Sequence, residues 1–139
     1  MLAKIFTNVF AGTLIVFSMA TSALANNDGS WIGLVHEESE IETCEIYIGV
    51  PIQARALGKR FFGWAQIGYD WHKVTGSVSN SGHITGTISA ANALNPNQVP
   101  SRMPAALRFS MQIDGDLAQG NWSAPNGCNG RVTAHKPLG

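Results

Sequence analysis

The sequence is poor in charge and in cysteine. Lys, Arg, Asp and Glu make up only 13% of the 139 residues, nine basic residues balance nine acidic ones, and there are two cysteines. A chain without an excess of basic residues lacks the positive patches by which proteins hold phosphate backbones or anionic membrane surfaces. We therefore expect neither nucleic acid nor an anionic membrane as a partner.

Motifs for catalysis and metal binding are missing too. No Gly-x-Ser-x-Gly nucleophile elbow occurs. His36 begins a sequence like the zinc-protease helix motif, but Glu40 stands where the second imidazole ligand is required. The Glu-rich residues 37–45 lack the Gly and Asp residues that build calcium loops, so a solvated loop is expected there. The other histidines are scattered singly and are expected at the surface or at edges: His72, His83 and His135. The sequence thus predicts a non-enzyme with no metal and no cofactor.

The first 25 residues have the features of an export signal. Lys4 precedes an apolar run over residues 9–20, and Ala23-Leu24-Ala25 supplies the small residues that signal peptidase requires. Cleavage before Asn26 would leave residues 26–139 as a single secreted or periplasmic domain without a membrane span. An uncleaved membrane anchor is the alternative.

Export would place both cysteines in an oxidising compartment, where two thiols in one chain usually pair. We therefore predict a disulfide between Cys44 and Cys128. The alternative is a redox or metal-binding role for these thiols.

Two near-identical segments predict a hairpin. Residues 74–78 and 84–88 are near copies, and a loop at residues 80–82 with a left-handed Gly82 sets Val78 opposite Ile84. The same register places Gly76 opposite Gly86. We expect a sharp bend or a core aromatic ring to fill the resulting notch, with a ligand notch as the alternative.

Other strands follow from apolar alternation. Residues 107–114 predict a strand that an Asp114-Gly115 loop turns back, with Met111 opposite Ala118. A loop at Tyr69-Asp70 would join residues 60–68 to residues 71–79, with Ala65 opposite Val74. The remaining predicted strands cover residues 31–36, 44–50, 118–123 and 128–135.

About eight short antiparallel strands, with no helical period outside residues 1–25, predict an all-β fold. An up-and-down β-barrel is the expected architecture, and a β-sandwich is the alternative. In the barrel, the predicted disulfide would join the second strand to the last and so hold the two ends of the meander together.

Gly-x-Trp occurs near each end of the chain, at Gly29-Ser30-Trp31 and at Gly120-Asn121-Trp122. Together with glycine-punctuated hairpins and one long-range cystine, it resembles small bacterial secreted β-barrels, namely the avidin and lipocalin-like group and periplasmic inhibitors of secreted metalloproteases. The resemblance implies architecture. The biotin-site pattern of avidins is replaced by Ile32-Gly33-Leu34, and residues 26–30 do not match the N-terminal trunk of the inhibitors.

The densest aromatic stretch supplies the first candidate contact site. The expected pairing points Phe61 inward and places Phe62 and Trp64 on the outer face, with Trp71 following on the next strand. A row of exposed aromatic side chains is typical of a surface that contacts a protein or a glycan. The alternative is a register shifted by one residue, which would put Trp64 in the core.

Residues 91–104 form the one long connection, with prolines spaced by four at positions 96, 100 and 104. Such loops often carry function, and proline lowers the entropic cost of binding. The segment could be a lid, a spacer, or an arm that presents Arg102 or Met103 to a protease.

These observations favour a secreted or periplasmic, non-enzymatic binding protein for a small molecule, glycan or envelope component. A protease inhibitor that acts through the proline-rich loop or a terminus is the alternative. A small hydrolase ranks third. A protein partner for the aromatic face also stays open.

Overall fold

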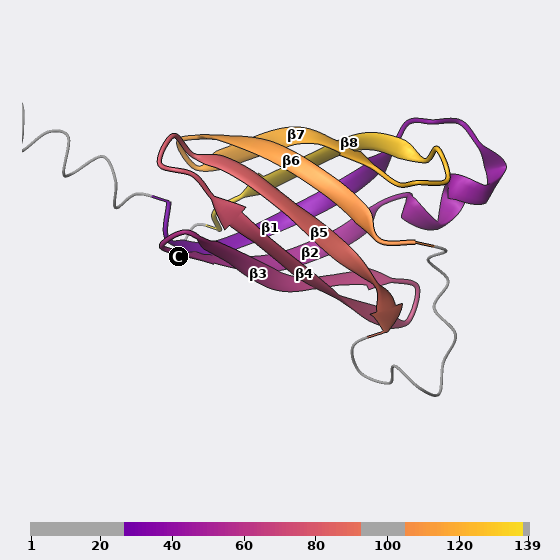
Figure 1. Cartoon of the computed structure of the whole chain (residues 1–139), viewed down its shortest axis with the longest axis horizontal. Coiled ribbons are helices and arrows are strands. Elements are labelled where there is room, and N and C mark those ends of the chain that lie inside the picture. The colour runs from indigo at the N-terminus through magenta and orange to yellow at the C-terminus, as the bar shows by residue number, and fades with distance from the viewer. Residues whose placement is uncertain (1–26, 93–104, 138–139) are drawn as a thin grey trace, which may run out of the picture.

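The computed structural model describes residues 27–92 and 105–137 (Figure 1). The predicted export signal, its cleavage point, and the loop residues Arg102 and Met103 lie outside the described residues. None of the helices in the described part is long and apolar enough to cross a bilayer.

The described residues form a closed antiparallel β-barrel, in which each strand pairs with the next and β8 pairs with β1 (Figure 1). This result confirms the predicted all-β barrel and excludes the β-sandwich. The strands are β1 (Gly29–Glu37), β2 (Val50–Leu57), β3 (Arg60–Ile67), β4 (Asp70–Val78), β5 (His83–Asn92), β6 (Leu107–Asp114), β7 (Leu117–Ser123) and β8 (Asn129–His135). A short 3₁₀ helix, η1 (Glu42–Tyr47), lies between β1 and β2.

The β4–β5 hairpin has the predicted register. Val78 is opposite Ile84, Gly76 is opposite Gly86, and Gly82 adopts a φ of 80°. The ring of Phe109 fills the notch at the paired glycines, since a Cβ placed on Gly86 would lie 2.6 Å from its Cζ atom. The expectation of a filled notch is therefore confirmed.

Two other predicted registers are wrong by two residues. Ala65 is opposite His72 rather than Val74, and Met111 is opposite Gly120 rather than Ala118. The loops consist of Gly68-Tyr69 and Gly115-Asp116, each with the glycine first and at a φ near 65°. Glycine at the first loop position is the requirement of a type II′ turn, whereas the predictions had placed the loops one residue away. A shift of two leaves every side chain on its predicted face.

The second strand was also misplaced. The alternation at residues 44–50 predicted a strand, but the chain forms η1 there and the strand is β2. Ile48 is 64% exposed, so the apparent period of two in this segment does not correspond to an inner face. In β2, by contrast, Val50, Ile52 and every second residue after them are buried.

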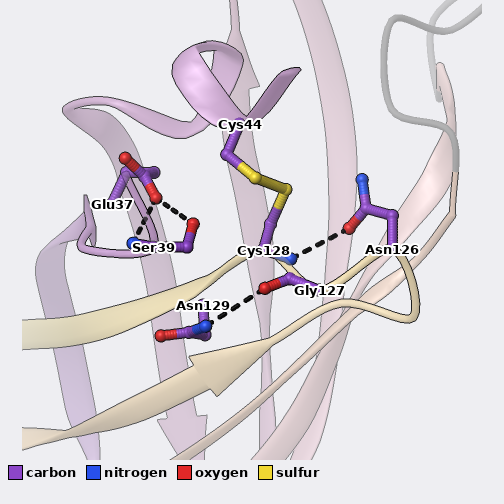
Figure 2. Close-up of a disulfide and its surroundings, with 7 residues drawn as sticks. All are labelled: Glu37, Ser39, Cys44, Asn126, Gly127, Cys128 and Asn129. Atoms are coloured by element: carbon purple, nitrogen blue, oxygen red, sulfur yellow. Dashed lines mark hydrogen bonds between the residues drawn. A yellow bond between two sulfur atoms is a disulfide. The ribbon is translucent and has the colours of Figure 1, made fainter. Parts of the chain in front are cut away.

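The predicted disulfide is present, although Cys44 belongs to η1 and Cys128 directly precedes β8. It fastens the β1–β2 connection to the β7–β8 loop at one end of the barrel (Figure 2). The backbone N–H of Cys128 donates to the side-chain oxygen of Asn126 at 3.2 Å, and the Asn129 amide donates to the carbonyl of Gly127 at 3.1 Å. At the same end, the Glu37 carboxylate accepts hydrogen bonds from the backbone and the hydroxyl of Ser39 (Figure 2).

Large side chains occupy the barrel interior. The rings of Phe61 and Phe109 meet edge to face with their centroids 6.1 Å apart, and Tyr47 from η1 packs on Trp122 with centroids 5.0 Å apart. Trp31 is also buried and donates a hydrogen bond to the carbonyl of Asn27. An eight-stranded barrel has room for such side chains in its interior, and here they form its core.

Candidate functional site

The outer face of β1, β2 and β3 carries a groove of about 360 Å³. Alternation along each strand sends one set of side chains into the core and the other set to this face. Outward-facing residues from all three strands line the groove, namely Ser30, Ile32, Gln53, Arg55, Phe62 and Trp64. Its volume lies at the lower end of the range for small-ligand sites.

Cross-strand pairing brings these residues together in two rows. The first row runs from Ile32 through Gln53 to Trp64, and Lys73 of β4 is opposite Trp64. Ile32 is 42% exposed and Trp64 is 43% exposed. Since directly opposed side chains on one face of a sheet are in contact range, this row combines apolar surface with an amide and an ammonium group.

The second row lies on the same face, two residues away along each strand, and contains Ser30, Arg55 and Phe62. The guanidinium of Arg60 lies over the Phe62 ring, 5.3 Å from its centroid. A cation over an aromatic face is attracted by the ring quadrupole, so this contact keeps Arg60 beside the groove.

The groove contains two of the three predicted aromatic contact residues, Phe62 and Trp64, but not Trp71. Phe61 is buried while Phe62 and Trp64 face outward, so the alternative that placed Trp64 in the core is wrong. Trp71 is half-buried on β4, opposite Gln66, and lies outside the groove. A contact between any of these residues and a partner stays a prediction.

Two polar side chains are buried elsewhere in the barrel, His72 on β4 and Tyr47 in η1. His72, which was expected at the surface or at an edge, is fully buried because β4 directs it into the core. Its Nδ1–H donates to the carbonyl of Ser89 at 2.8 Å. Among the described residues, neither the Nε2 atom of His72 nor the hydroxyl of Tyr47 has a hydrogen-bond partner. Burial raises the pKa of the Tyr47 phenol above its ordinary value of 10.0.

The sequence predictions missed Tyr47 because they assigned its segment to a strand. The signal that could have located His72 was the alternation of β4, in which His72, Val74 and Val78 share the buried face. A lone histidine at an apolar position is more simply a core residue than a ligand, and in the described part of the chain no group of three or more His, Cys, Asp or Glu side chains could hold a metal ion.

Comparisons with known proteins do not extend these observations. No protein-family model, curated protein or solved structure matches the chain.

Proposed function

We propose that this protein is an exported, non-enzymatic binding protein that holds a glycan in the outer groove of β1, β2 and β3. Its location outside the cytoplasm, secreted or periplasmic, is supported by the cystine, because reducing compartments rarely maintain structural disulfides. The observation that carries the proposal is the exposed Trp64 beside Phe62 and Gln53 in one groove.

The filled interior argues for an outer site. Barrels that enclose a ligand leave a cavity among their inward-facing side chains. In this barrel Trp31, Phe61 and Phe109 occupy the interior and are at most 4% exposed. The ligand is accordingly assigned to the outside of the barrel.

The groove has the chemistry that a sugar ring requires. The C–H faces of a pyranose are apolar and stack on indole or phenyl rings, while its hydroxyl groups need hydrogen-bonding partners around the edge. Trp64 and Phe62 supply the aromatic surface, and the amide of Gln53, paired with Trp64, supplies both a donor and an acceptor.

Calorimetric titration of the exported protein with a panel of neutral and acidic oligosaccharides tests the proposal. We expect Trp64→Ala to weaken binding about thirtyfold, the effect of truncating a central aromatic contact. The exposed Tyr69 in the β3–β4 turn lies outside the groove, so Tyr69→Ala is the matched control and should bind as the native protein does.

The unfolding free energy of Trp64→Ala should fall by no more than about 2 kcal/mol, since Trp64 is 43% exposed and contributes less than a core ring. Absence of binding to every oligosaccharide, or binding that is insensitive to Trp64→Ala, would contradict the proposal. A stability loss of about 3 kcal/mol or more would show that the variant loses binding through lost packing and not through a lost contact.

A further inference from the structure

We infer that the glycan bound in this groove is acidic, and that Arg55 holds its carboxylate. The inference rests on the proposed function and adds the charge of the ligand.

Cations surround the aromatic surface of the groove. Arg55 lines it and is opposite Phe62, Arg60 lies over the Phe62 ring, and Lys73 is opposite Trp64. In the described part of the chain, neither Arg55 nor Lys73 forms an ion pair with a carboxylate. Both are exposed, so their charges are available to a ligand.

Acidic side chains are concentrated elsewhere. Five of the nine lie in residues 37–45, at the end of the barrel that carries η1 and the disulfide, and one of these, Glu38, is paired with Arg131. Asp28 precedes β1 and accepts a hydrogen bond from the backbone N–H of Gly58 at 2.8 Å. No carboxylate lines the groove among the described residues. The local charge is therefore positive although the charges of the whole chain balance.

An anion that also has an apolar, ring-shaped face fits this arrangement. A guanidinium binds a carboxylate with two parallel hydrogen bonds, while the adjacent indole and phenyl rings stack on the sugar. An anionic lipid fits less well, because its acyl chains need an apolar cavity and the interior of this barrel is occupied by Trp31, Phe61 and Phe109. A uronic acid unit within an oligosaccharide meets both requirements.

The test compares uronate oligosaccharides with their uncharged methyl esters. Oligomers of glucuronate, galacturonate and mannuronate are titrated against the exported protein, each beside its methyl ester, which keeps the rings and removes the negative charge. We expect at least one series to bind about tenfold or more tightly as the free acid. Because the cations are exposed, this preference should shrink as salt is added.

Variants assign the preference to the groove. Arg55→Gln should bring the acid and the ester to nearly equal affinity, whereas Arg108→Gln, an exposed arginine of β6 outside the groove, should leave the preference unchanged. Trp64→Ala should weaken acid and ester together.

The outcomes separate the two claims. Equal binding of acid and ester, with Trp64 still required, would overturn the acidic ligand and leave the glycan site in place. If neither Arg55→Gln nor Trp64→Ala changes the affinity, or if no oligosaccharide binds, both the glycan site and the acidic ligand would be overturned. Binding to phosphatidylglycerol vesicles without binding to uronates would assign the surface to a membrane and also overturn the inference.

Discussion

Removal of the disulfide should destabilise the barrel strongly. The perturbation is the double variant Cys44→Ala with Cys128→Ala, in which both buried sulfur atoms are lost. The bond closes a loop with a sequence separation of 84 residues. A cross-link lowers the conformational entropy of the unfolded chain by an amount that grows with the logarithm of the loop length. The expected contribution to the free energy of unfolding is therefore about 4.5 kcal/mol.

That value is an upper figure, because unfolded chains retain structure and some of the entropy is already lost. It is nevertheless a large share of the ~5–15 kcal/mol by which domains of this size are stable. Urea unfolding of the native protein and the double variant measures the difference, and the variant should also show a steeper denaturant dependence because its unfolded state is more expanded.

The native protein in a thiol reductant is the control for the atoms lost on substitution. Reduction breaks the cross-link without creating a cavity, so the two perturbations should agree to within about 2 kcal/mol. The structure adds a local expectation. η1 is attached to the barrel by the disulfide and by the packing of Tyr47 on Trp122, so either perturbation should increase the solvent exposure of Trp122 and shift its fluorescence. A stability loss below about 1 kcal/mol in both forms would show that the disulfide contributes little to the stability of the barrel.

Two further predictions concern the core. Burial raises the pKa of Tyr47, so the folded state keeps its phenol protonated at pH values where the unfolded chain releases the proton. Titration of Tyr47 should therefore leave the free energy of unfolding unchanged below about pH 10 and lower it above that pH. Urea midpoints should show that Tyr47→Phe removes the loss of stability above about pH 10 while Tyr69→Phe does not. An unchanged pH dependence in Tyr47→Phe would mean that the Tyr47 phenol is not its source. Gly86→Ala should lower stability by at least about 2 kcal/mol in thermal unfolding, since its Cβ would lie 2.6 Å from both Phe109 Cζ and the Thr75 carbonyl oxygen; a neutral effect would show that the strands are further apart.

The sequence was sufficient to predict which face most strands bury. Side chains alternate between the two faces, so a register error of two residues leaves each of them on the predicted face. Phe61 inward and Trp64 outward are correct although the β3–β4 register was wrong by two. The β4–β5 register could be predicted residue by residue, because its two strands are near copies and Gly82 marks the loop. Loop position was the weak point, since a glycine can take the first or the second place of a two-residue turn and each choice implies another turn type.

The second strand could not be found from the pattern alone. Residues 44–50 alternate as a strand does, yet the tertiary contacts of Cys44 and Tyr47 favour a helical turn there. For the candidate site, the sequence indicated Phe62 and Trp64 but not the groove, because Ser30, Ile32, Gln53 and Arg55 reach it through cross-strand pairing. Contacts of this kind depend on register, which short-range patterns leave open.

Oxidative footprinting of the aromatic side chains, read by mass spectrometry, locates the ligand on the protein. In the free protein, Trp64 should react readily, while Trp31 and Trp122, which are 1% and 2% exposed, should react slowly. If the ligand occupies the outer groove, a saturating uronate oligosaccharide protects Trp64 and leaves the reactivity of Tyr69 unchanged. Protection of the interior tryptophans with no change at Trp64 would instead place the ligand inside the barrel, against the proposed outer site.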